Sequence, residues 1–495
     1  MTEATLPAPP RTSADLPEDP QTARRNSRVI SLLLVSAFVV ILNETIMGVA
    51  LPKLMADLQI PATAAQWLTT AFMLTMAVVI PITGYLLQRF NTRPIFIAAM
   101  SLFSLGTLIS AMAPGFEVLL VGRVVQASGT AIMMPLLMTT VMTLVPVASR
   151  GRTMGNIAIV MSVAPAIGPT ISGLILSVLD WRWMFWLVLP IAIGALILGA
   201  SRIENVTTPR KAPVDVLSVL LSVFAFGGLI YGLSTLGAPA EDGSLPGWVP
   251  LVVGIVGLIA FVLRQLVLHK SDRALLDLRT FTSTTFTVSI VMMFVSMMAL
   301  FGTLIMLPIY LQTVLGLEPV VTGLLMLPGG LVMGLLGPIV GRLYDRVGPR
   351  VLLVPGSIIV SGVIWSMTLM NEHTPFVLVL IAHITLSIGL ALMFTPLFTA
   401  GLGAVRPALY SHGSAIVGTV QQLAGAVGTA LFVAVMSTQM LALKSDGLSV
   451  TSATAGGIQA AFLCGAVISL FAVAASFFVK KPVVDPAHEM VPSGH

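Results

Sequence analysis

Long apolar runs separated by short polar loops dominate this chain. A helix needs about 20 predominantly apolar residues to cross the hydrocarbon core of a bilayer. By this measure the sequence predicts fourteen membrane-spanning helices, and only 9% of its residues are charged, compared with about a quarter in soluble domains. We therefore expect an all-α membrane protein. The predicted spans are residues 30–51, 66–87, 94–112, 118–142, 153–179, 183–200, 214–237, 248–268, 285–314, 320–343, 351–369, 375–399, 411–436 and 458–479.

The distribution of positive charge predicts how these spans are oriented. If both termini are cytoplasmic, the cytoplasmic segments contain 21 of the 25 Lys and Arg residues, and the outer loops contain three. Lys and Arg stay preferentially on the cytoplasmic side of a membrane. We therefore predict a multi-pass protein of the plasma (cytoplasmic) membrane with both termini in the cytoplasm. Because the basic residues are spread over many loops rather than gathered in one patch, we expect no nucleic acid partner.

Two loops of the chain repeat one pattern. PITGYLLQRFNTRP (residues 81–94) follows the second predicted span, and PIVGRLYDRVGPRV (residues 338–351) follows the tenth. Pro, Ile, Gly and Leu recur at an offset of 257 residues, which also brings the first span onto the ninth. Repeated halves of this kind build many secondary transporters. The predicted division is a disordered cytoplasmic tail (1–29), an N-terminal six-helix bundle (30–200), a linker with two extra helices (201–284), a C-terminal six-helix bundle (285–480) and a cytoplasmic tail (481–495).

The second loop copy resembles the signature GxLxDRxGxRxxL of the major facilitator superfamily. The matching residues are Gly341, Leu343, Asp345, Arg346, Gly348 and Arg350. The first copy departs from the signature, with Gln88 in place of the acid and Asn91 in place of the glycine. In the first span, LNETIMGVALP resembles the LDxTIVNVALP signature of drug:proton antiporters with fourteen spans. Here Asn43 replaces the acid, and Glu44 supplies a carboxylate next to it.

Two more segments are similar to signatures of that antiporter family. GRVVQASGTA in the fourth span keeps the Arg, the Gln and the last Gly of RxxQGxG, and APAIGPTISG in the fifth span resembles GxxxGPxxGG. The residues kept are Arg123, Gln126, Gly129, Gly168, Pro169 and Gly173. The resemblance covers nearly all of residues 30–480 and implies a major facilitator fold. It also implies that the span-5 motif seals the resting state against leak, although tight helix packing alone is an open alternative. We expect Asn43 and Gln126 to line the substrate cavity and the polar face of the fourth span.

Glu44 is the only acidic residue of the sequence that lies deep in a predicted span. An ionised carboxylate in hydrocarbon costs several kcal/mol, so it must be paired, line a cavity or take up a proton. Arg123 is predicted at the same depth, about 10 Å from the outer boundary at 1.5 Å per residue. Two hypotheses stay open, namely a static ion pair between the two spans and a pair that forms and breaks as Glu44 is deprotonated and protonated. The family resemblance implies that both residues contribute to proton coupling.

Asp345 is predicted to latch the cytoplasmic side, because an acid in this loop can meet a helix N-terminus or the adjacent arginines. The alternative for this loop is that its arginines only set the membrane orientation, which would explain Arg346 and Arg350 but not Asp345. Gln88 cannot supply charge, so we expect a weaker latch in the N-terminal half. His383, in the twelfth span, is expected to be a buried polar contact or a proton relay.

The function that these features favour is proton-coupled multidrug efflux. We expect an antiporter that exports lipophilic cationic or neutral compounds by alternating access and confers antibiotic resistance. The alternative is a proton-coupled exporter of one endogenous metabolite or of a self-made antibiotic. No metal-spaced His/Cys cluster, nucleophile motif or phosphate-binding glycine loop is present, which argues against a membrane enzyme. We therefore expect no enzymatic activity, no cofactor and no metal. The expected protein is a monomer whose partners are small lipophilic substrates, protons and the lipid bilayer.

Overall fold

The computed structural model describes residues 20–206, 209, 215–235, 246–271 and 273–479. These residues contain 14 helices that are long and apolar enough to cross a membrane, which confirms the predicted number. The first six are α1 (Pro20–Leu58), α2 (Ala62–Arg89), α3 (Thr92–Ala111), α4 (Phe116–Leu144), α5 (Arg150–Val178) and α6 (Trp183–Arg202).

A hairpin of two spans follows, and then six more helices. The first span of this inserted hairpin is continuous but changes type along its length, from α7 (Val216–Ser222) through the π-helix η3 (Val223–Gly227) to α8 (Gly228–Thr235). Its second span is α9 (Trp248–Leu268). The remaining helices are α10 (Thr284–Ile309) with its π-helical end η6 (Tyr310–Val314), α11 (Pro319–Val347), α12 (Arg350–Met367), α13 (Phe376–Gly403), α14 (Tyr410–Ser445) and α15 (Val450–Ser476). Short 3-10 turns are η2 (Val147–Ser149), η4 (His269–Ser271), η5 (Leu278–Thr282) and η7 (Pro407–Leu409).

The prediction of a disordered N-terminal tail is wrong for the last ten residues of that tail. The sequence predicts disorder over residues 1–29, but α1 begins at Pro20, so residues 20–29 are helical. Proline is well tolerated in the first turn of a helix, and the apolar span that follows provides a helix that this segment can extend. Arg25 also forms an ion pair with Glu204 at 3.8 Å. The rest of that tail, and the predicted tail 481–495, lie outside the described residues.

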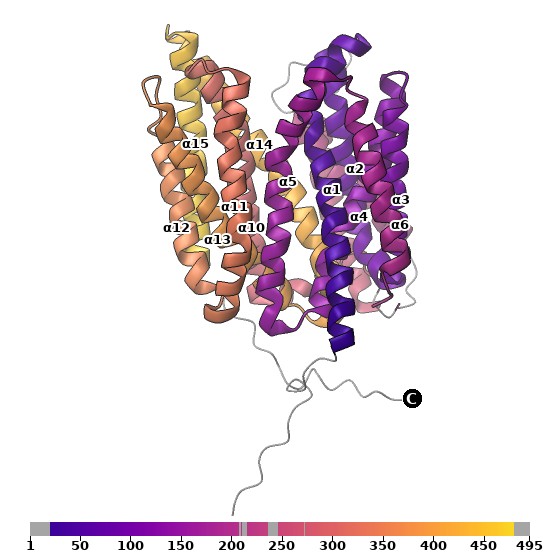
Figure 1. The fold of residues 1–495 in the computed structure, drawn as a ribbon. Helices are drawn as coiled ribbons and strands as arrows, with labels where there is room; N and C mark the ends of the chain where they lie inside the picture. The colour runs from indigo at the N-terminus through magenta and orange to yellow at the C-terminus, as the bar shows by residue number, and fades with distance from the viewer. Residues whose placement is uncertain (1–19, 207–208, 210–214, 236–245, 272, 480–495) are drawn as a thin grey trace, which may run out of the picture.

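The twelve helices outside the inserted hairpin form two groups. Helices α1–α6 pack on one another, and α10–α15 do the same. Figure 1 shows the two groups side by side, converging toward the bottom of the view and diverging toward the top. Between the groups, α5 packs on α11 and α2 packs on α14. These two interfaces correspond under the repeat, because the offset of 257 residues relates α2 to α11 and α5 to α14.

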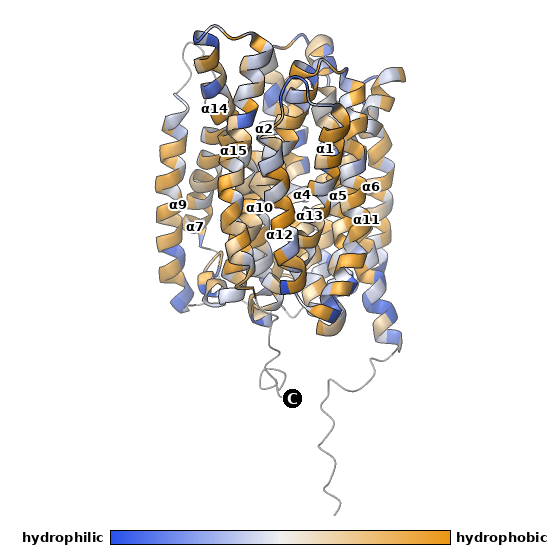
Figure 2. Cartoon of the chain, turned by 90° about the vertical axis from the view of Figure 1, so that its left-hand side faces the viewer, coloured by the Kyte–Doolittle hydropathy of each residue, from blue (hydrophilic) through white to orange (hydrophobic). Residues whose placement is uncertain are grey.

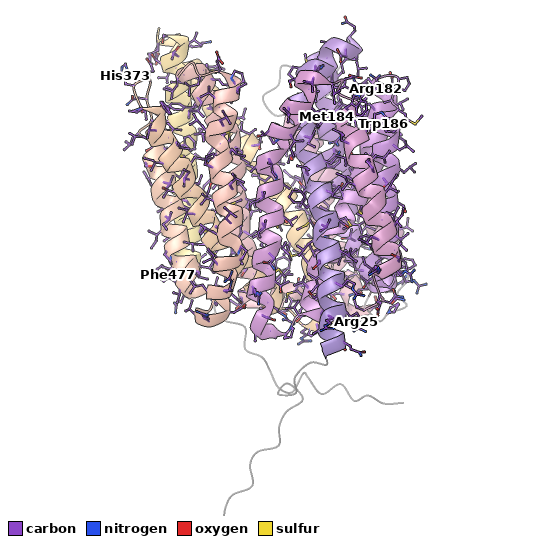
Figure 3. All side chains as sticks on the ribbon, in the orientation of Figure 1. Arg25, Arg182, Met184, Trp186, His373 and Phe477 are labelled. Carbon is purple, nitrogen blue, oxygen red and sulfur yellow. The ribbon has the colours of Figure 1, made fainter. Side chains whose placement is uncertain are left out.

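The outer surface and the two ends of the bundle differ in polarity. In Figure 2 apolar residues dominate the middle of the helices, and hydrophilic residues gather at the ends. This is the pattern expected of helices that cross a bilayer. Figure 3 shows Arg25 and Phe477 toward one end, and Arg182 and His373 at the other. The N-terminus of α1 and the C-terminus of α15 therefore lie at the same end of the molecule. The helix α11 also ends there (Figure 1), where its Asp345 meets the start of α5, and we call this the Asp345 end.

Candidate functional site

The carboxylate of Glu44 lies on α1 without a direct partner. Glu44 is partly exposed, and among the described residues it forms neither a hydrogen bond nor an ion pair. The neighbouring side chain of Asn43 is only 2% exposed, and its Oδ1 atom has no hydrogen-bond partner there. This part of α1 therefore carries an unpaired carboxylate beside an unsatisfied buried amide, and both groups are costly in an apolar environment.

Arg123 on α4 is held by neutral groups. Its side chain is 1% exposed. One guanidinium nitrogen donates to Gln126 Oε1 at 2.6 Å, and Nε donates to the carbonyl oxygen of Leu68 at 3.5 Å. The guanidinium also lies over the ring of Phe72, 4.0 Å from its centroid, a contact worth about 0.5–2 kcal/mol. These contacts fix the arginine without neutralising its charge.

A short chain of hydrogen bonds connects Arg123 to α3. Gln126 Nε2 donates to Thr107 Oγ1 at 2.8 Å, and Thr107 Oγ1 donates to the carbonyl oxygen of Phe103 at 2.7 Å. Gln126 lies where α3 and α4 almost touch, because a Cβ atom on Gly106 would be 2.3 Å from the Gln126 nitrogen. Gln126 therefore orients Arg123. The sequence interpretation did not identify Thr107 or Phe72, because nothing in the sequence shows which residues of α2 and α3 face α4.

The predicted direct ion pair between Glu44 and Arg123 is absent from this structure. No ion pair or hydrogen bond between them is present in the described part of the chain, although their charges are close enough to interact. Equal depth along two helices does not place two side chains on facing surfaces, and Arg123 binds the side chain of Gln126 and the carbonyl of Leu68 instead. A static ion pair is therefore not what holds α1 to α4 in this conformation.

The Gly-Pro motif of α5 is in contact with α1 at the residue next to Glu44. A Cβ atom on Gly168 would lie 2.2 Å from Thr45 Oγ1, so only glycine permits this approach of the two helices. Thr45 Oγ1 itself donates to the carbonyl of Leu42 at 3.0 Å. Pro169, which is exposed, has no N–H to donate within α5. Gly173 has nothing within 4 Å of its Cβ position, so packing in this conformation does not explain a glycine there.

The carboxylate of Asp345 binds the N-terminus of α5. Its Oδ1 accepts from the backbone N–H of Gly151 at 2.8 Å, and its Oδ2 accepts from the N–H of Arg152 at 2.9 Å. The first N–H groups of a helix have no partner within the helix and attract negative charge. The sequence left two partners open for Asp345, a helix N-terminus and the adjacent arginines. The structure shows the helix N-terminus in contact with the carboxylate. Arg346 and Arg350 are exposed.

Two glycines of the signature have a structural reason. A Cβ atom on Gly341 would lie 2.1 Å from the carbonyl oxygen of Gly151, so glycine is needed where α11 crosses α5. Gly348 ends α11 with a φ of 80°, a conformation that side chains other than glycine rarely adopt. In the first copy Asn91 has a φ of −67°, so that turn does not need a glycine.

The first copy of the loop makes a weaker version of the same contact. Gln88 Nε2 donates to the carbonyl oxygen of Ala408, in η7 before α14, at 3.2 Å. A Cβ atom on Gly84 would be 3.2 Å from both Ala415 and His412, so α2 and α14 are less closely packed than α11 and α5. Each copy thus touches the start of a helix in the other half, but only the second copy does so with a charge.

At the opposite end the two halves are apart. On α5 and α11, glycines near the Asp345 end are in contact, with the Cβ position of Gly155 2.3 Å from the carbonyl oxygen of Gly337. Further along the same helices, Gly173 and Gly323 have nothing within 4 Å of their Cβ positions. Figure 1 shows the same divergence of the two groups of helices. The structure is therefore closed at the Asp345 end and separated at the other end.

A second polar network joins the inserted hairpin to the segment before α10. Arg264 on α9 donates to both carboxylate oxygens of Asp215, at 3.1 and 2.8 Å. These hydrogen bonds from Arg264, together with those from Ser218, lower the pKa of Asp215 to about 2. Gln265 Nε2 donates to Ser218 Oγ, and Gln265 Oε1 accepts from the backbone N–H of Leu275. The sequence interpretation placed Asp215 only at the end of a span and missed this network. A polar residue at the end of each hairpin helix could have indicated it.

His383 on α13 is a buried contact in this structure. Its side chain is 7% exposed, and its Nε2 atom lies 3.1 Å from the carbonyl oxygen of Met326 on α11. A carbonyl can only accept, so Nε2 carries the proton in this contact. Its Nδ1 atom has no partner among the described residues, and no group of three His, Cys, Asp or Glu side chains in that part of the chain could hold a metal ion.

Comparison with known proteins identifies relatives over almost the whole chain. Residues 33–429 match the Major Facilitator Superfamily. The uncharacterized MFS-type transporter YcnB of Bacillus subtilis is 41% identical, over 92% of this chain and 95% of that protein. The lincomycin resistance protein LmrB of Bacillus subtilis is 39% identical, over 92% of this chain and 96% of that protein. Among solved structures, the human organic anion transporter MFSD10 (TETRAN) has the same fold, with a TM-score of 0.65 and 14% identity over 92% of this chain and 99% of that chain.

Proposed function

The chain belongs to the major facilitator superfamily, and from this premise we propose that it is a proton-coupled exporter of lipophilic drugs. It is a membrane transporter and not an enzyme, as its relatives are. The observation that carries the proposal is the pair of intramembrane charges, namely the unpaired, partly exposed carboxylate of Glu44 on α1 and the buried guanidinium of Arg123 on α4. The name of LmrB, a lincomycin resistance protein, supports drug export and makes lincomycin the first compound to test.

The proposed coupling begins with the charge on Glu44. When Glu44 is ionised, Arg123 attracts it across the space that separates them in this structure. When Glu44 takes up a proton, this attraction is lost and α1 is free to shift relative to α4. A local change of charge of this kind can bias a protein that has two stable arrangements. Because Arg123 is oriented by Gln126, we propose that the arginine stays in place and that α1 moves.

The helix α5 connects this event to the closed end of the molecule. Its Gly168 is in contact with Thr45, next to Glu44, and the N–H groups of Gly151 and Arg152 at its start bind Asp345. A shift of α1 is therefore passed to α5 at its middle, and α5 in turn pulls on the contact with Asp345. We propose that this contact opens when the binding site faces the cytoplasm, and that the Asp345 end is the cytoplasmic end, with both termini there.

The experiment is transport by the purified protein in liposomes, with the pH gradient and the membrane potential imposed separately. The substrates are lincomycin, tetraphenylphosphonium as a permanent monovalent cation, and chloramphenicol as a neutral compound. With one proton exchanged per substrate, export of a monovalent cation moves no net charge, whereas export of a neutral compound moves one charge, worth about 2.3 kcal/mol per 100 mV.

The proposal predicts that a pH gradient alone drives accumulation of tetraphenylphosphonium. Collapse of the membrane potential should slow transport of chloramphenicol and leave that of the cation unchanged. Substrates that only equilibrate across the membrane under both gradients would contradict proton coupling. If transport of the cation slows as much as that of chloramphenicol, the one-proton cycle is wrong.

A further inference from the structure

An apolar pocket lies between α2 and the inserted hairpin. Its volume is about 470 Å³, and it is lined on one side by Trp67, Val78 and Val79 of α2 and on the other by residues of η3 and α8. None of the residues that line it is charged. The pocket shares no residue with the site around Glu44 and Arg123 described above. Figure 2 shows the hairpin helices α7 and α9 at the edge of the molecule.

The pocket exists because of how the hairpin is built. Its wall includes the π-helix Val223–Gly227, and single π-helical turns inside longer helices are frequent at functional sites. At Gly227 a Cβ atom would meet only Val78 Cγ2, at 3.9 Å. At the next residue, Gly228, a Cβ atom would be 2.8 Å from the backbone of Gly254 on α9. The hairpin is thus closely packed internally and leaves space on the side that faces α2.

The pocket has the length and depth of one leaflet of the bilayer. From Trp67 to Val79 the lining of α2 extends over about 18 Å at 1.5 Å per residue, while half of the hydrocarbon core is about 15 Å thick. At its outer end Trp67 and Tyr231 form a ring pair with centroids 5.4 Å apart, and Trp and Tyr are enriched where hydrocarbon meets the headgroups. Trp67 and Val223 are each 40% exposed, so the pocket is open to the surrounding lipid.

We propose that this pocket binds one acyl chain of a phospholipid from the leaflet farther from Asp345. Pockets for drug-sized ligands usually contain a few polar groups that fix the orientation of the ligand. Here the hydroxyl of Thr75 donates instead to the carbonyl of Ala71 at 2.7 Å. A long, uncharged pocket with aromatic rings at the headgroup level therefore matches a lipid chain better than a drug. The bound chain fills the space between the first bundle and the hairpin, independently of what the protein exports.

The experiment compares variants that fill the pocket with a matched substitution elsewhere. Gly227→Phe fills the pocket from the hairpin, and Val78→Phe fills it from α2. Gly194→Phe is the control, because Gly194 is exposed on α6 and has nothing within 4 Å of its Cβ position. Native mass spectrometry of the detergent-purified proteins counts the phosphatidylcholine molecules that each retains. Brominated phosphatidylcholine is added in parallel, and its quenching of Trp67 fluorescence is isolated by comparison with Trp67→Phe.

The wild-type protein and Gly194→Phe should retain one phospholipid and show quenching of Trp67. Both filled variants should lose the retained lipid and the quenching, while thermal unfolding confirms that they are folded. Equal lipid retention by the filled variants and the control would overturn the proposal. It would also be overturned if tetraphenylphosphonium, rather than a filled pocket, abolished the quenching, because the occupant would then be a small lipophilic molecule.

Discussion

Replacement of Asp345 by Asn should weaken closure of the end at which the two halves meet. The carboxylate accepts two backbone hydrogen bonds from the start of α5, at 2.8 and 2.9 Å. Asparagine has one accepting oxygen, so it loses at least one of these bonds together with the negative charge at the helix N-terminus. A hydrogen bond to a charged group contributes about 1.5–3 kcal/mol, and the interaction with the helix dipole contributes about 0.3–1 kcal/mol.

The lost hydrogen bond alone, about 1.5–3 kcal/mol, corresponds to a shift of about 10- to 100-fold in the equilibrium between the closed and open forms, and the lost dipole interaction adds to it. The natural control is Gln88→Ala, which removes a single neutral hydrogen bond to the carbonyl of Ala408. Such a bond contributes about 0.5–1.5 kcal/mol. The control should therefore shift the same equilibrium by roughly tenfold or less.

The assay is labelling of a cysteine placed in the contact between α5 and α11. Ser162 is 5% exposed and lies beside Gly330 and Gly334, so Ser162→Cys reports opening with little change in volume. The background is Cys464→Ser, which removes the only natural cysteine. A charged maleimide applied from the Asp345 end should label the Asp345→Asn protein much faster than the Gln88→Ala protein. Equal labelling of the two would refute the reasoning that charge makes the second loop copy the stronger contact.

Three further variants test other parts of the account. Arg123→Ala leaves Gln126 without its cationic partner and should change the pH profile of drug transport. Arg123→Lys should restore the profile only in part, because lysine lacks the planar guanidinium. An unchanged profile in Arg123→Ala would mean that the charges of Glu44 and Arg123 do not interact in transport. Gly341→Ala places a Cβ 2.1 Å from the carbonyl of Gly151 and should open the Asp345 end more than Gly84→Ala, whose nearest contacts are at 3.2 Å. The rate of cysteine labelling at position 162 measures this opening. Equal labelling rates in the two variants would contradict the prediction. Asp215→Asn should lower the unfolding temperature at neutral pH. Because hydrogen bonds from Arg264 and Ser218 lower the pKa of Asp215 from 3.8 to about 2, the difference from wild type should shrink only on acidification through that range. A difference that is absent near neutral pH would rule out this ion pair as its source.

The sequence predicted the number and type of the helices well, because hydrophobic length is a direct requirement of the bilayer. It also predicted the repeat and the unusual position of Glu44, since both can be read from residue type and spacing. The start of α1 at Pro20 was missed, because a polar segment attached to a long helix can remain helical even though its composition resembles that of a tail.

The partners of the charged residues could not be predicted in the same way. Arg123 was expected to pair with Glu44 because the two are at the same depth, but depth does not determine which face of a helix a residue occupies. In the structure Arg123 donates hydrogen bonds to the side chain of Gln126 and the carbonyl of Leu68 instead. Likewise Asp345 had two open alternatives, and its contact with the N-terminus of α5 depends on the approach of α11 to α5 through Gly341 and Gly151, which the sequence does not show.

The most direct test of proton coupling by Glu44 is accumulation of tetraphenylphosphonium by liposomes that contain Glu44→Gln. The glutamine preserves the size of the side chain but cannot exchange a proton near neutral pH. With a pH gradient imposed, the wild-type protein should concentrate the cation, whereas Glu44→Gln should bind it and only equilibrate it across the membrane. Accumulation by Glu44→Gln at the wild-type rate would contradict the account, because a different group would then have to carry the proton.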